Sequence, residues 1–74
     1  MEIKLAMGNV LVEYIGEKKK GHQEVKVIQK NDYVTTVDIG RIYLADVQKA
    51  TDITIDSKEM AIINVKYIKA EKLC

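Results

Sequence analysis

The chain has 74 residues, a formal net charge of +1 and a single cysteine, which fits one domain (residues 1–74) whose stability as a lone monomer is marginal. The near-neutral charge excludes a strong overall field for nucleic acid, and no apolar run reaches the roughly 18 residues that a membrane span needs. Because Phe, Trp and Pro are absent, the core must come from Ile, Val, Leu and Met, of which the β-branched members favour strands.

The first half of the chain predicts short strands separated by polar loops. Residues 1–7 alternate weakly and predict an edge strand, and residues 10–15 predict a strand with Val10, Val12 and Tyr14 on one face and both faces covered. A polar loop with two glycines follows at residues 16–23. The remaining predictions for this half are a strand at 24–30 with Val25 and Val27 on one face, a turn within 29–32, and a looser extended segment at 33–39 that leads into Gly40.

The second half predicts a strand at 41–47 and a hairpin between strands 51–55 and 59–65. The turn Asp56-Ser57-Lys58 contains no glycine, so Ser57 or Lys58 must adopt a positive φ, or the turn must be longer. A kink at Lys66-Tyr67 precedes a last short strand at 68–73. With no helical periodicity anywhere, the sequence predicts an all-β fold of about six short strands, with Val12 and Ile62 on inward faces.

Several short runs within residues 37–70 resemble, in residue type and in spacing, the runs of a known protein family. They are VDIGRIYL (37–44), ITID with its short turn (53–59), the apolar run MAII (60–63) and the ending IKA (68–70). Near the start, MEIK (1–4), NVLVE (9–13) and EVKVI (24–28) continue it. Together these runs resemble the GroES-like (chaperonin-10) co-chaperonin family.

The resemblance implies a small β-barrel subunit that assembles with copies of itself into a seven-membered ring, caps a chaperonin and assists protein folding. The first and last strands of neighbouring subunits would pair, and both would otherwise be open edges. The expected interface residues are Ile3, Leu5, Ile68, Ala70 and Leu73. The expected partner-binding loop consists of Gly16, Glu17, Lys18, Lys19, Lys20, Gly21, His22 and Gln23.

This loop departs from the family, whose long mobile loop docks through an apolar segment. Residues 16–23 contain no apolar side chain, so binding through them would use Lys18, Lys19 and Lys20 and would weaken in salt, although such lysines are also often merely solvated. Otherwise the contact would lie on the Val25-Val27-Ile28 strand or in residues 29–36. The roof loop within 29–36 is also short, and the family's proline is missing.

Two alternatives to the co-chaperonin interpretation stay open. One is the same barrel acting as a binding or inhibitory module of a phage or mobile element. The other is a small OB- or SH3-like barrel that binds nucleic acid, with Tyr33 and Tyr43 as a stacking pair, against which the near-neutral charge argues.

No catalytic chemistry is indicated by the sequence. His22 has no second histidine or cysteine nearby, and no carboxylate pair or framed nucleophile is evident, so no enzyme, metal or cofactor is expected. One cysteine, Cys74, cannot form an internal disulfide, and the N-terminus lacks the apolar core of a signal peptide. We therefore expect a cytoplasmic protein in which Cys74 is a terminal thiol.

Overall fold

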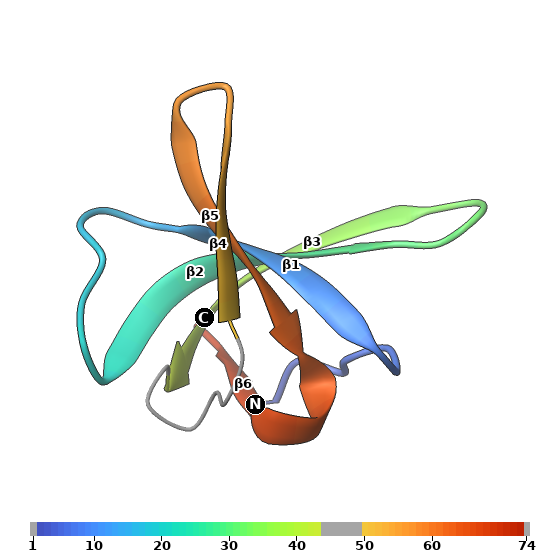
Figure 1. The fold of residues 1–74 in the computed structure, drawn as a ribbon. Helices are drawn as coiled ribbons and strands as arrows, with labels where there is room; N and C mark the ends of the chain where they lie inside the picture. The colour runs from blue at the N-terminus through green and yellow to red at the C-terminus, as the bar shows by residue number, and fades with distance from the viewer. Residues whose placement is uncertain (1, 44–49, 74) are drawn as a thin grey trace.

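The computed structural model describes residues 2–43 and 50–73 as one antiparallel sheet of six strands (Figure 1). The strands are β1 (Asn9–Tyr14), β2 (His22–Lys30), β3 (Thr35–Tyr43), β4 (Ala50–Ile55), β5 (Lys58–Asn64) and β6 (Ala70–Lys72), and a 3₁₀ turn, η2 (Val65–Tyr67), separates the last two. Their order in the sheet is β4-β5-β1-β2-β3-β6. The all-β prediction is confirmed, and within the described residues no ladder joins the two ends of this order.

The core lies on the face of the sheet that the alternation in β1 and β2 predicts. Val10, Val12 and Tyr14 are buried, and the register pairs Val12 with Val27 and Tyr14 with Val25 on the same face. This assignment is confirmed because directly paired residues of an antiparallel ladder point to the same side. The opposite face of β1 is only half-buried, so the expectation that both faces are covered holds in part.

In strand β5 the prediction of which isoleucine points inward was wrong. Ile62 was expected to point inward, but it is 37% exposed, whereas its neighbour Ile63 is fully buried. The register gives the reason: Ile63 pairs with Val10 of the inner face, and Ile62 pairs with Leu11 of the outer face. A run of apolar residues such as MAII contains no alternation that could have selected between them.

Strand β3 replaces two predicted segments with one. The sequence suggested a loose segment ending near Gly40 and a separate strand at 41–47, but β3 runs unbroken from Thr35 to Tyr43. It stays extended because β2 pairs with it along all nine positions, from His22 opposite Tyr43 to Lys30 opposite Thr35. The end of the predicted strand, residues 44–47, lies outside the described residues, as does Cys74.

The hairpin between β4 and β5 turns at two residues that both have a positive φ. Asp56 has φ 49° and Ser57 has φ 65°, which is the pattern of a two-residue turn that matches the twist of its strands. Ser57 adopts the positive φ expected of it, Asp56 shares it, and Lys58 already begins β5. The predicted kink at Lys66-Tyr67 is η2, where the Asn64 side chain accepts a hydrogen bond from the Lys66 backbone amide.

Residues 2–8, here called the N-terminal arm, run from β6 to the start of β1. The Ile3 amide donates to the Ala70 carbonyl at 2.9 Å, and Glu2 forms an isolated bridge with Glu71. The arm is therefore not the full strand that the sequence suggested. The pairing expected between the first and last segments of neighbouring subunits is made here within one chain.

Candidate functional site

The predicted partner-binding loop is anchored by its last residue. Gln23 belongs to β2 and is 1% exposed. Its amide oxygen accepts from the Lys19 amide at 2.6 Å, and its amide nitrogen donates to the carbonyls of Ile15 and Glu24 at 3.3 and 3.0 Å. A buried amide with its groups satisfied in this way fixes the path of the loop over the end of the sheet.

Lys18 connects the same loop to β4. Its ammonium group forms an ion pair with Asp52 and lies 5.1 Å from the centre of the Tyr14 ring, while the Tyr14 hydroxyl donates to Asp52 at 2.9 Å. The hydrogen bond from Lys18 lowers the pKa of Asp52, and the same bond raises the pKa of Lys18. Burial, followed by the bond to Asp52, raises the pKa of Tyr14. Lys18 is thus engaged within the chain, whereas Lys19 and Lys20 extend into solvent.

The predicted interface residues lie largely inside the single chain. Ile3, Ile68 and Ala70 belong to the buried core, and Leu5 and Leu73 are half-buried. Side chains that are buried in their own core cannot at the same time contact the surface of another subunit. A contact between subunits through them requires the arm to leave its own β6 and bind that of a neighbour.

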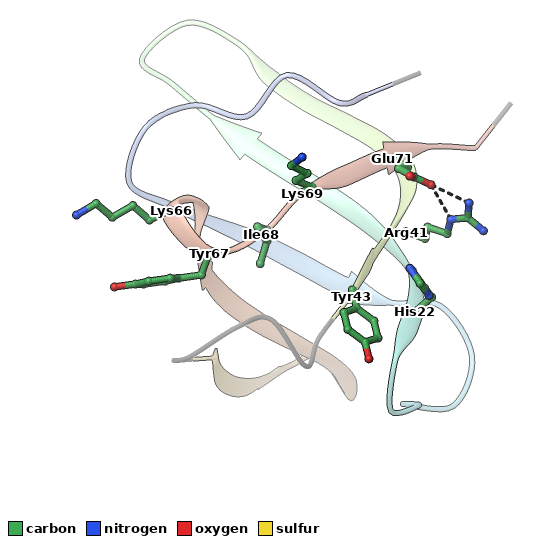
Figure 2. Close-up of a pocket in the computed structure, with 8 residues that line it drawn as sticks. All are labelled: His22, Arg41, Tyr43, Lys66, Tyr67, Ile68, Lys69 and Glu71. Carbon is green, nitrogen blue, oxygen red and sulfur yellow. Dashed lines mark hydrogen bonds and ion pairs between the residues drawn. The ribbon is translucent and has the colours of Figure 1, made fainter.

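A cleft of about 490 Å³ opens between the end of the β2–β3 pair and the segment that follows β5 (Figure 2). His22, Arg41 and Tyr43 line it from one side, and residues 66–69 line it from the other. His22 and Tyr43 are opposite each other in the β2–β3 register, and their ring centres are 4.8 Å apart with an angle of 35° between the planes. The cleft therefore has an aromatic pair fixed by the sheet itself.

Of the described residues that line this cleft, the charged ones are mostly positive. Arg41 donates from Nε and Nη2 to one carboxylate oxygen of Glu71, at 2.9 and 2.7 Å, across the β3–β6 pair. These bonds hold the pKa of Glu71 below its usual value. Lys66 and Lys69 add two further cations from the segment after β5, and the Lys66 side chain extends away from His22 and Tyr43 (Figure 2).

The structure brings together residues that the sequence did not connect. His22 was expected to be an exposed loop residue, and it is exposed, but it begins β2 and pairs with Tyr43. The suggested stacking pair of Tyr33 and Tyr43 does not form, because Tyr33 lies in the turn at the far end of β3. Tyr67, not considered with Tyr43, lines the same cleft. A continuous pairing of β2 with β3 is the signal that would have separated Tyr33 from Tyr43.

A second groove, of about 740 Å³, lies between the arm and the far end of the β2–β3 hairpin. Leu5, Met7, Leu11 and Ile28 give it an apolar lining, and Met7 is 98% exposed. Such an exposed apolar side chain beside an apolar groove is a feature of surfaces that bind proteins.

The adjacent hairpin turn adds more exposed apolar surface. Asn31 Oδ1 accepts from the amides of Tyr33 and Val34 at 2.8 and 2.7 Å, which holds a tight turn. Tyr33 is 94% and Val34 57% exposed. Of the two other contact regions considered from sequence, residues 29–36 offer a surface, whereas in the strand Val25 and Val27 are fully buried and only Ile28 is partly exposed, in the second groove.

The described residues contain no helix with the length and hydropathy of a membrane span, and no cluster of three or more His, Cys, Asp or Glu side chains placed to hold a metal. Comparisons with known protein families, with curated proteins and with solved structures found no match. Any functional conclusion therefore depends on the residues of this chain.

Proposed function

We propose that the chain is a GroES-like co-chaperonin subunit, which closes into a small barrel, assembles with copies of itself in the cytoplasm, caps a chaperonin and assists folding without chemistry of its own. The element order supports this: β3, a tight β4–β5 hairpin, η2 and β6 occur where the runs that resemble the family lie. The observation that carries the proposal is the contact between the N-terminal arm and β6.

The arm makes few bonds to β6, and the Gln29 side chain of β2 also holds it, by accepting from the Ala6 amide and donating to the Lys4 carbonyl. One backbone hydrogen bond, from Ile3 to Ala70, and one bridge residue join the arm to β6, and the Ile3 side chain packs against Gly40. The arm meets β1 at Gly8, which has φ 97°. A rotation there would move the arm onto the β6 of a neighbouring copy, where the same contacts form between chains, as in domain-swapped assemblies.

The contact with the chaperonin is assigned to the exposed apolar side chains beside the second groove. Burial of an apolar side chain such as Met7 or Val34 contributes roughly 1.5–3 kcal/mol, whereas an exposed ion pair contributes about 1 kcal/mol at most. The loop at residues 16–23 has only ion pairs to offer, and Lys18 is already engaged with Asp52. Tyr33, Val34 and Met7 are therefore the stronger docking candidates.

The assembly is tested by the native mass of the full chain. Native mass spectrometry or multi-angle light scattering should give a ring, and a chain lacking residues 2–7 should be monomeric. A full chain that stays monomeric at high concentration would reject the arm-exchange assembly.

The partner is tested by binding to a purified chaperonin ring in the presence of ATP. We expect Tyr33→Ser with Val34→Ser to abolish retention of the protein on the ring, and Lys18→Ser with Lys19→Ser and Lys20→Ser to leave it largely intact. The reverse result would return docking to the charged loop. A chain that assembles but is not retained by any chaperonin would favour the alternative of a phage or mobile-element binding module.

A further inference from the structure

We propose that the cleft between His22, Tyr43 and Tyr67 binds single-stranded nucleic acid, with bases stacked on the rings and phosphates held by Lys66 and Lys69. This inference is independent of the co-chaperonin proposal, because it uses a different surface and no contact between copies. It concerns a short stretch of one strand, since the cleft volume of about 490 Å³ is within the range of small-ligand sites.

The rings provide the stacking surface. His22 and Tyr43 are held 4.8 Å apart by their opposite positions in the β2–β3 pair, so this pair needs no rearrangement before binding. Tyr67 lies beyond Ile68 from these two rings, and its own ring is directed away from them, so it offers a separate stacking surface (Figure 2). Tyr43 and Tyr67 are each 39% exposed, which leaves ring surface for a base. Stacking on such rings accepts any base and contributes substantially to single-strand binding.

The charges favour an anion in the same place. Among the described residues, three cations line the cleft against one carboxylate, Glu71, and that carboxylate is already paired with Arg41 through two hydrogen bonds. Lys66 and Lys69 are left to contact phosphates, whose counterions are released on binding. The near-neutral charge of the whole chain argued against nucleic acid, but it averages over this local excess of positive charge.

Other polyanions match the cleft less well. A duplex hides the faces of its bases, so it would use the lysines and leave the rings without partners. An acidic peptide likewise supplies charge without a planar group for each ring. The combination of rings and cations is what selects a single strand.

The rings are tested by fluorescence anisotropy with labelled oligo-dT and oligo-rU of about ten nucleotides, a length typical of such sites, at about 50 mM salt. Both single strands should bind more tightly than a duplex of equal length or poly-Glu. Tyr67→Ala should weaken binding roughly tenfold, which corresponds to the loss of one stacked base, whereas Tyr67→Phe keeps the ring and should bind as the parent does.

Parallel titrations over a range of salt concentrations test the lysines. Lys66→Ser with Lys69→Ser should reduce the slope of log affinity against log salt by about 1.4, since each phosphate contact on a single strand contributes about 0.7. Lys30→Ser with Lys58→Ser removes equal charge at hairpin ends away from the cleft and should leave the slope unchanged. Circular dichroism verifies that each variant is folded.

Three results would overturn the proposal. They are the absence of binding by either oligonucleotide at low salt, equal binding of parent and Tyr67→Ala, and poly-Glu binding as tight as that of the single strands. The last would identify an acidic peptide as the better ligand. Preference for RNA over DNA, or the reverse, supports the site and adds a contact to the sugar.

Discussion

Ile3 of the arm lies directly over Gly40 of β3, and the two residues fit together only because residue 40 has no side chain. A Cβ at this position would lie 2.5 Å from Ile3 Cδ1 and would overlap the carbonyl oxygen of Glu71. The arm and β6 therefore both cover the same point of β3. This glycine is required for close approach of neighbouring chain segments, which explains why it does not interrupt the strand.

Gly40→Ala should lower the free energy of unfolding by about 1–3 kcal/mol, as overpacking does elsewhere. Urea denaturation followed by circular dichroism measures the loss. Adding Ile3→Ala removes one of the two overlaps, so the double variant should lose less than the sum of the single losses. Strict additivity would show that Ile3 does not contact residue 40.

Ile63 and Ile62 form a matched pair of neighbouring isoleucines on opposite faces of β5. Ile63→Ala should cost about 2–5 kcal/mol because it leaves a cavity among fully buried residues. Ile62→Ala, at a partly exposed position, should cost less than half as much. Equal losses in urea denaturation would mean that the register between β1 and β5 is shifted by one residue.

The contact of Lys18 with Asp52 and Tyr14 should open at acidic pH. The pKa of Asp52 is lowered in the folded chain by Lys18, so its contribution to stability is present above the unfolded pKa and is lost as pH falls through the folded value. Because the pair is exposed, the contribution is no more than about 1 kcal/mol.

NMR signals of the Tyr14 ring provide the measurement for this opening, since its hydroxyl donates to Asp52. They should shift with an acidic midpoint below the ordinary aspartate value of 3.8. Asp52→Asn should remove that titration and leave the sheet intact. A Tyr14 titration that persists in Asp52→Asn would assign the shift to another carboxyl group.

The turn between β4 and β5 can be improved. Asp56 and Ser57 both have a positive φ, which costs free energy for residues with a side chain, whereas Asn-Gly is the preferred pair for such a turn. Asp56→Asn with Ser57→Gly should raise the thermal midpoint and add roughly 0.5–1 kcal/mol of stability. A matched Lys58→Gly, at the start of β5, should be destabilising instead.

Sequence patterns sufficed where one face of a strand is apolar and the other polar. Val25 and Val27 alternate with charged residues, and both are buried as predicted. In MAII no residue marks the outer face, so only pairing with β1 determines which isoleucine points inward. The turn position was recognised, but the sharing of positive φ between Asp56 and Ser57 depends on the two-residue register of the hairpin.

The candidate cleft could not be predicted from local sequence patterns, because its residues are brought together only by the pairing of strands. His22 and Tyr43 are distant in sequence and become neighbours through the β2–β3 ladder. Tyr67 belongs to η2, which places it at the same cleft. Conversely, Tyr33 lies in the turn before β3 and Tyr43 at the other end of that strand, and β3 alone, at about 3.3 Å per residue, spans roughly 26 Å from Thr35 to Tyr43.

The bond between Ile3 and Ala70 has a consequence for biosynthesis. In the order of translation the arm precedes its partner strand β6, so the cover over Gly40 is completed only after β6 has been made. Until then the nascent chain exposes an apolar Ile3 and an unpaired edge of β3, which are features that promote association between unfinished chains. Closure of the arm onto β6 within one chain is therefore a late step, and it removes both of these features.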